Sequence, residues 1–225
     1  MKNITLICFV KTPGLSPLKT RLSHGLGSEN SQQCYLQMID IVRELFHLVN
    51  STFAQVSCYW AIAEAEGLES PLWSSHNKML QAKGSLANRL HLAQYGMNDE
   101  FHRFIYIGSD APALSIEHIR NTLEGLDNND HVIGPAKDGG FYLFASKVPI
   151  TQELWNSVNY STSMTFKNLH DALPGKKMIL PELSDVDQVS DLTKTLLDLE
   201  ASEILSSSQI KFKSYIKELQ AILVS

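Results

Sequence analysis

The chain has 225 residues, of which 44% are hydrophobic and 19% are charged, and its formal net charge is −5. This length fits a single α/β domain over residues 1–225 that can bury a full hydrophobic core. Lysine and arginine are scattered rather than clustered, so we expect no nucleic-acid partner. The first apolar run, residues 4–10, is too short for a signal peptide or a membrane span, so we expect a cytoplasmic protein without a membrane partner.

Cysteine and histidine show no metal-binding pattern. Cys8, Cys34 and Cys58 lie in apolar segments without a CxxC pair, so we expect buried, free thiols. The eight histidines form neither an HxH nor an HExxH pair, and none is assigned a role.

Strand and helix patterns alternate along the chain. Residues 4–10 form a continuous apolar run rich in β-branched side chains, as expected of a strand buried on both faces. A helix follows, with Ser28 or Ser31 as its expected cap. Its apolar face is formed by Cys34, Met38, Ile41, Leu45 and Leu48. A strand over residues 56–63 precedes a helix face made by Leu86, Leu90, Ala93 and Met97.

The same alternation continues in the second half. A strand over residues 104–108 ends just before Asp110, and Ser115 is the expected cap of a helix that carries Ile116, Ile119, Leu123 and Leu126. Further strands are predicted over residues 131–136, 140–145 and 177–180, and further helices over residues 162–173 and 190–204. This order of elements predicts a mostly parallel sheet with helices on both faces.

Residues 206–225 are predicted to form a C-terminal helix. The periodic residues within 209–223 make a single apolar stripe: Phe212, Ile216, Leu219 and Leu223. This stripe either packs against the sheet of its own chain or serves as the face of a homodimer. The serine triplet at residues 206–208 is short enough for a turn between two helices.

The loop after the first strand, KTPGLSPLKTRL at residues 11–22, contains three cations, Lys11, Lys19 and Arg21. Loops in this position bind ligands in open α/β sheets, and the three charges suit a di- or triphosphate. The loop is not a P-loop, because Pro13 and Leu18 occupy the required glycine positions. A basic surface turn is the alternative interpretation.

The segment FIYIGSDAPAL, residues 104–114, places Asp110 directly after an apolar strand. Mg²⁺ needs only one or two protein carboxylates, because water and substrate phosphate complete its octahedron. Asp110 is therefore a candidate metal ligand. It could instead cap the following helix, although Ser115 is already placed to do so.

Two further segments carry acidic residues. In GPAKDGGFYL, residues 134–143, Asp138 precedes two glycines in a predicted hairpin turn, which alone favours a structural role. In SDVDQVSDL, residues 184–192, Asp191 is expected to stabilise a helix N-terminus. Asp185 or Asp187 is then free to meet a metal.

Taken together, these blocks resemble the bacterial family called radical-SAM/selenodomain-associated transferase 1, a branch of the glycosyltransferase-A-like (GT-A-like), nucleotide-diphosphosugar transferase superfamily. The likeness covers roughly residues 3–193. It is carried by Lys11, Pro13, KTRL at 19–22, Gln81, Gly84, Leu86, Arg89, GSDAPAL, GPAKDGGFYL, Ser161-Thr162 and DVD at 185–187.

The resemblance implies a GT-A-like three-layer sandwich that transfers a group from a nucleotide sugar or a nucleoside triphosphate to a small-molecule acceptor. It implies that Mg²⁺ or Mn²⁺ is held by Asp110 and Asp187. It places four cations beside the nucleotide: Lys11, Lys19, Arg21 and Arg89. Asp138 would face the acceptor as a contact or base, so that Asp110 and Asp138 form the catalytic pair.

This chain departs from the family pattern around the nucleotide and the acceptor. The departures are Ser16, Ala82, Ser85, Ala87, Asn159-Tyr160 and Gln188-Val189. The favoured function is glycosyl transfer, which releases a nucleoside diphosphate. The alternatives are nucleotidyl transfer, which releases pyrophosphate, and a nucleotide-binding module without catalysis, suggested by the substituted glycines and Ser85.

Overall fold

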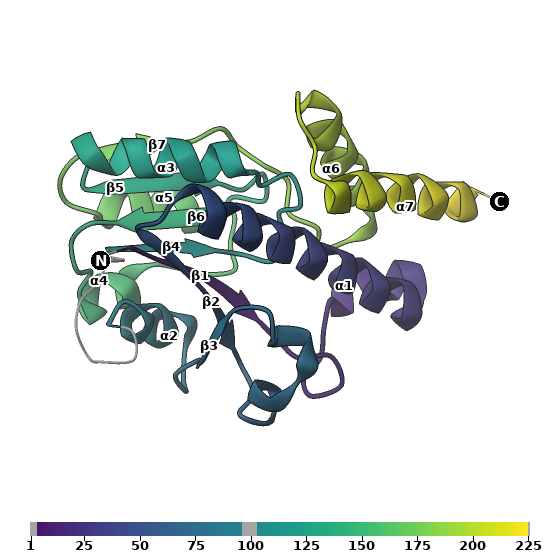
Figure 1. Ribbon diagram of the computed structural model, residues 1–225, viewed down its shortest axis with the longest axis horizontal. Helices are drawn as coiled ribbons and strands as arrows, with labels where there is room; N and C mark the ends of the chain where they lie inside the picture. Colours follow the sequence, from purple (N-terminus) through teal and green to yellow (C-terminus); the bar gives the residue numbers. More distant parts are fainter. Residues whose placement is uncertain (1–3, 96–102, 225) are drawn as a thin grey trace.

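The strands form a seven-stranded sheet, in the order β3-β2-β1-β4-β6-β5-β7, in a computed structural model that describes residues 4–95 and 103–224 (Figure 1). Only β6 runs antiparallel to its neighbours, β4 and β5, and every other pair is parallel. The strands are β1 (Ile4–Val10), β2 (Val56–Ile62), β3 (Asn77–Leu80), β4 (Arg103–Ile107), β5 (His131–Pro135), β6 (Phe141–Ser146) and β7 (Lys177–Ile179).

Helices cover both faces of the sheet, which confirms the predicted three-layer α/β architecture (Figure 1). One face packs against α1 (Thr20–Thr52), α3 (Ile116–Asn128), α6 (Val189–Ala201) and α7 (Ser207–Val224). The other face packs against α2 (Leu86–Ala93), α4 (Gln152–Ser157) and α5 (Thr165–Ala172). Two short 3₁₀ helices, η1 (Glu66–Glu69) and η2 (Pro71–Trp73), join β2 to β3.

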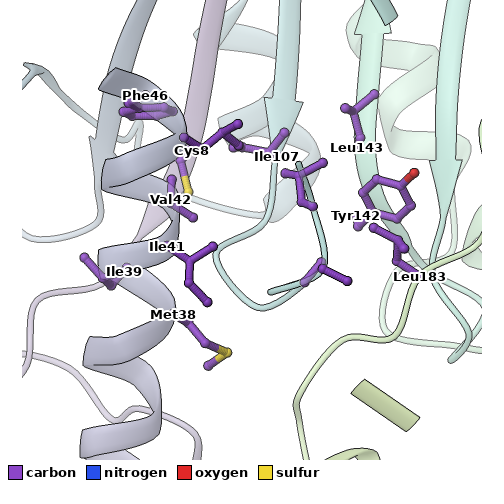
Figure 2. Close-up of a cluster of buried hydrophobic side chains, with 14 of the residues drawn as sticks. Cys8, Met38, Ile39, Ile41, Val42, Phe46, Ile107, Tyr142, Leu143 and Leu183 are labelled. Carbon is purple, nitrogen blue, oxygen red and sulfur yellow. The ribbon is translucent and has the colours of Figure 1, made fainter. Parts of the chain in front are cut away.

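The strand β1 shows why the sheet has two apolar faces. Its side chains alternate, with Cys8 in the cluster beneath α1 and Ile7 in the cluster on the opposite face. Figure 2 shows Val42 and Phe46 of α1 beside Cys8, within one cluster of buried side chains. All three cysteines are buried, as predicted.

The first helix begins earlier than the sequence pattern predicts. It starts at Thr20 and is interrupted at Gly27, whose φ of 78° and ψ of 163° are not helical. Ser31 does not cap the helix, because its hydroxyl donates to the carbonyl of Gly27 at 2.7 Å instead of accepting from a backbone N–H. The kink at a glycine lets the first turns follow the loop while the rest packs on the sheet.

Other element bounds also differ from the prediction. The strand β3 and the helix α4 were not predicted, since β3 is only partly buried and α4 has just six residues. The helix predicted from residue 162 begins at Thr165, and the one predicted to reach residue 204 ends at Ala201. Met97, which was assigned to the α2 face, lies outside the described residues.

The C-terminal helix α7 packs on its own chain. Phe212, Ile216 and Leu219 are buried against the cluster that includes α1 and α6, whereas Leu223 is exposed. Figure 1 shows α7 beside α6 and α1. The stripe therefore packs mainly against the neighbouring helices α1 and α6. Within residues 4–95 and 103–224, no helix has both the length and the apolar character that crossing a bilayer requires.

Candidate active site

The charged candidate residues meet at one cavity of about 350 Å³ beside the ends of β1 and β4. After β1 the chain continues outward to β2 and β3, and then β4 is added on the opposite side of β1. Such a reversal of strand order opens a crevice at the carboxyl ends of the strands, where α/β sheets bind ligands. Six charged residues line the cavity: Lys11, Lys19, Arg21, Arg89, Asp110 and Asp187.

Lys19 lies between two carboxylates inside this cavity. Its Nζ donates to Asp110 Oδ2 at 3.0 Å and to Asp187 Oδ1 at 3.2 Å. The Lys19 side chain is only 8% exposed, whereas those of Asp110 and Asp187 are 37% and 33% exposed. The two carboxylates thus remain open to the cavity while the lysine is enclosed.

The loop from β1 is fixed where it leaves the strand. The Tyr35 hydroxyl accepts from the backbone N–H of Lys11 at 3.1 Å and donates to the Lys11 carbonyl at 2.7 Å. The backbone N–H of Thr12 donates to Glu64 Oε2 at 2.9 Å, and Trp73 Nε1 donates to the Thr12 hydroxyl at 3.1 Å. These bonds set the start of the segment that carries Lys19 and Arg21.

Lys19 itself has a left-handed backbone, with φ 43° and ψ 43°, immediately before α1. The left-handed backbone conformation is sterically unfavourable for a residue with a β-carbon. Such conformations are concentrated at functional sites. In this conformation the Lys19 side chain contacts Asp110 and Asp187.

Asp110 follows β4 in the turn after Gly108. Its carboxylate folds back over this glycine, since a β-carbon at residue 108 would lie 2.6 Å from Asp110 Oδ1. Asp110 lines the cavity together with Ser109.

A backbone hydrogen bond positions the segment that carries Asp187 beside Asp110. The N–H of Val186 donates to the carbonyl of Asp110 at 2.8 Å, which joins the segment before α6 to the turn after β4. Asp191 Oδ2 accepts from the backbone N–H groups of Asp187 at 3.2 Å and Gln188 at 3.0 Å. Asp191 thus stabilises the start of α6, as predicted, and Asp187 lines the cavity.

Asp110 and Lys19 keep each other charged. Burial alone would lower the pKa of Lys19, but the charges and hydrogen bonds of Asp110 and Asp187 outweigh it and raise that pKa above its usual value. Burial likewise favours a protonated Asp110, but the Lys19 ammonium prevails and lowers the pKa of Asp110. The cavity therefore holds fixed charges of both signs at neutral pH.

Asp110 and Asp187 fit a divalent cation as its two protein ligands. Both carboxylates lie within hydrogen-bonding distance of one point, the Lys19 Nζ, and both are partly exposed. Among the described residues no group of three histidine, cysteine, aspartate or glutamate side chains could hold a metal. Two carboxylates with water and phosphate suffice for Mg²⁺ or Mn²⁺, so the donor set suits a metal that arrives with its substrate.

The other three cations have weaker contacts with the protein. Arg21 is 71% exposed and lies 3.3 Å from Asp187 Oδ2. Arg89 donates through Nε to the Gly84 carbonyl at 3.1 Å, and Lys11 Nζ lies 3.5 Å from the Pro17 carbonyl. Lys11 and Arg21 are exposed and can turn toward an anion in the cavity, whereas Arg89 is half-buried and also donates to Gln81 Oε1 at 3.4 Å.

Asp138 belongs to a different, adjacent cavity. This second cavity measures about 220 Å³ and shares Phe9 and Leu86 with the charged one. Asp138 Oδ1 accepts from the Gly140 N–H at 2.7 Å in the turn between β5 and β6, so the predicted hairpin role is confirmed. Asp138 also lines the cavity, so its role in the turn is compatible with a second role as a contact or base for the acceptor.

Asp185 is a residue whose role the sequence leaves undecided. The charged cavity is lined by Asp187 and not by Asp185. Burial, reinforced by the negative charges of Asp138 and Asp110, raises the pKa of Asp185 to about 7. No sequence pattern signals this shift, because it depends on three acidic segments that meet only in the folded chain.

A comparison with protein-family profiles finds one family that matches the chain. The profile of the family DUF2064, described as an uncharacterized protein conserved in bacteria, matches residues 45–162, just over half of the chain. The matched part includes Arg89, Asp110 and Asp138 but neither Lys19 nor Asp187. No curated protein sequence matches the chain.

Comparison with solved structures identifies the fold as GT-A-like. A provisionally named nucleotide-diphospho-sugar transferase from Desulfovibrio desulfuricans G20 superimposes with a TM-score of 0.80 at 23% identity, over 100% of this chain and 98% of that one. The CMP:2-keto-3-deoxy-manno-octonic acid synthetase complexed with CTP gives 0.51 at 11% identity, over 88% of this chain and 99% of the other. Rv0371c of Mycobacterium tuberculosis H37Rv in complex with manganese gives 0.50 at 12% identity, over 86% and 97%.

Proposed function

The chain belongs to the bacterial protein family DUF2064, and from this premise we propose that it is a metal-dependent transferase with a nucleotide-diphosphate donor, acting as a glycosyltransferase. We further propose that the chain is a transferase of the radical-SAM/selenodomain-associated transferase 1 family. The observation that carries it is the Lys19 ammonium held between Asp110 and Asp187 in a cavity lined by three further cations. Cations that could bind phosphate and carboxylates that could bind a metal thus face the same space.

The charges of the cavity suit a diphosphate. Lys19 and Arg21 follow β1, and Lys11 and Arg89 line the same cavity, so that cations can contact several phosphate oxygens. Asp110 and Asp187 would hold Mg²⁺ or Mn²⁺, which when bound offsets negative charge on the departing diphosphate. The manganese complex of a protein with a similar fold supports this choice of metal.

The acceptor would approach from the second cavity. An acceptor hydroxyl oxygen forms a bond to the donor's anomeric carbon, and the bond from that carbon to the diphosphate oxygen breaks with its electron pair. The hydroxyl proton passes to the Asp138 carboxylate, which lines this cavity, and the nucleoside diphosphate leaves. Lys19 and Arg21 stabilise the charge on the leaving group.

Nucleotidyl transfer is the second candidate, favoured by the fold shared with the CMP:2-keto-3-deoxy-manno-octonic acid synthetase, which was solved in complex with CTP. In this reaction an acceptor oxygen attacks the α-phosphorus, and pyrophosphate leaves. The same cations and the same metal ligands would serve. The two reactions differ in the product that they release.

The test measures turnover and product identity with a panel of nucleotide sugars and nucleoside triphosphates, with Mg²⁺ or Mn²⁺ present. We expect nucleoside diphosphate as the product, and Asp110→Asn to lower turnover at least about a hundredfold because it removes a metal carboxylate with little change in volume. Asp127→Asn, an exposed position on α3 away from the cavity, should leave turnover unchanged.

If pyrophosphate is the product, the reaction is nucleotidyl transfer and not glycosyl transfer. Tight nucleotide binding without any turnover would instead indicate a binding module. Wild-type turnover in Asp110→Asn at saturating metal would remove Asp110 from the mechanism.

A further inference from the structure

The second cavity has a chemical character of its own. Aromatic residues from four separate segments line it: Phe9 from β1, Tyr106 from β4, Phe141 and Tyr142 from β6, and Tyr160 from the segment after α4. Leu86 and Leu90 of α2 complete its apolar wall. We propose that this cavity binds the acceptor through an aromatic ring, so that the acceptor is a small aromatic alcohol. The role as acceptor rests on the proposed function.

Three of the hydroxyl groups that line the cavity are already used by the protein. Tyr106 donates to the Leu90 carbonyl at 2.7 Å, and Tyr160 donates to the Trp155 carbonyl at 3.0 Å. Thr165 donates to the Asn159 carbonyl at 2.8 Å. The hydrogens of these three hydroxyl groups are therefore not available to a ligand.

A sugar or another polyol would bind here at a disadvantage. Each of its hydroxyl groups would lose water, and few partners would replace that water. An aromatic ring loses little by leaving water and gains edge and face contacts with the surrounding rings. Phe9 and Tyr106 already pack edge-to-face, with ring centroids 5.3 Å apart, which leaves a rigid aromatic wall.

The size of the cavity sets the size of the ring system. Its volume of about 220 Å³ exceeds the volume of about 150 Å³ that suffices to bind benzene in an apolar protein cavity. The space therefore suits one substituted six-membered ring or a fused pair of rings.

Polar groups at the cavity orient the ligand. Asp138 and Ser161 line it, and no hydrogen bond of the Ser161 side chain occurs within the described part of the chain. Ser161 has a left-handed backbone with φ 58°, an uncommon conformation for serine. With its ring among the aromatic residues, the alcohol oxygen of the acceptor would lie beside Asp138 and face the charged cavity that shares Phe9 and Leu86.

Group transfer to an aromatic alcohol follows the same steps as transfer to any other alcohol. The aromatic alcohol's oxygen bonds to the donor carbon, its proton passes to Asp138, and the nucleoside diphosphate leaves with the electron pair of the broken bond.

The experiment measures binding of benzyl alcohol and glycerol to the full chain by ligand-observed NMR, without any nucleotide. We expect benzyl alcohol to bind and glycerol not to bind. Phe141→Ala should weaken benzyl alcohol binding about tenfold, because it removes one ring of the wall. Phe166→Ala is the matched control: Phe166 is partly buried against the same apolar cluster but does not line the cavity, so this variant should keep the wild-type affinity.

Equal binding of the two probes by the wild-type protein would overturn the proposal, and so would equal loss in the two phenylalanine variants. A parallel titration with uridine and cytidine diphosphates and Mn²⁺ tests nucleotide binding separately from binding of the aromatic acceptor. Nucleotide binding without benzyl alcohol binding would refute the aromatic acceptor alone. Benzyl alcohol binding without nucleotide binding would retain the aromatic site and refute the proposed function.

Discussion

Lys19 and Asp110 are 91 residues apart in the chain, yet Lys19 Nζ lies 3.0 Å from Asp110 Oδ2 at the crevice between β1 and β4. The same ammonium lies 3.2 Å from Asp187 Oδ1. A lysine, two carboxylates and the expected metal thus share one small region, which means that the ammonium and a divalent cation compete for the same oxygens.

This competition gives the first prediction. Lys19→Met keeps the apolar stem but removes the charge, so it should raise the affinity for Mn²⁺ in the absence of nucleotide. The same change should lower the affinity for a nucleoside diphosphate about tenfold, because a charge-assisted contact to phosphate is lost. Calorimetry with each ligand measures both effects. Lys11→Met is the control for the metal, since Lys11 contacts neither carboxylate; an equal gain in Mn²⁺ affinity there would refute the competition.

The second prediction concerns the loop that carries Lys19. Tyr35→Phe removes the hydroxyl that bonds both the N–H and the carbonyl of Lys11, so the loop should lose its anchor and nucleotide affinity should fall several-fold. Tyr59→Phe, in β2, removes a hydroxyl that makes no hydrogen bond among the described residues. Calorimetric affinities that fall equally in both variants would show that the Tyr35 bonds do not position the loop.

The third prediction tests the turn that carries Asp138. Gly139 has a φ of +92°, and a β-carbon there would lie 2.2 Å from the Ser163 carbonyl oxygen. Gly139→Ala should therefore lower the free energy of unfolding by about 1–3 kcal/mol, measured with urea. Gly14 has a φ of +84° but nothing within 4 Å, so Gly14→Ala isolates the cost of the backbone conformation and should destabilise less.

Much of the fold could be predicted from the sequence because its patterns are local. The strand β1 has the predicted bounds, Ile4–Val10, and Ser115 precedes α3 as expected. The strand β3 could not be predicted, because Asn77 and Leu80 are exposed at the edge of the sheet and leave no apolar run. The early start of α1 was missed because only Leu22 and Leu26 mark its apolar face before the kink at Gly27.

The candidate site was predicted only in part. Motif positions identify Lys19, Asp110 and Asp187, and the structure places all three at one cavity. The pairing of Lys19 with both carboxylates could not be predicted, because it depends on how β1, β4 and the start of α6 come together. The aromatic cavity was missed for the same reason, since its rings come from four segments without a shared motif.

The fourth prediction is a pH dependence of stability. Burial, with the nearby charges of His47 and Arg43, lowers the pKa of His76 from 6.5 to about 4. The unfolded chain therefore takes up a proton before the folded chain does, so stability is complete above pH 6.5 and falls as the pH drops toward 4. His76→Phe keeps an aromatic ring beside Phe46 and removes this loss. Urea unfolding of both proteins from pH 7.5 to pH 4 measures the difference; parallel curves would contradict it.

The most direct measurement is calorimetric binding of a nucleoside diphosphate with Mn²⁺ or with a chelator, for the wild-type protein and for Asp110→Asn and Asp187→Asn. If Asp110 and Asp187 hold the metal on the diphosphate, Mn²⁺ should tighten binding to the wild-type chain at least about tenfold, and each variant should lose most of that gain. Equal affinities with Mn²⁺ and with chelator in the wild-type chain, or an undiminished gain in both variants, would contradict this assignment of the site.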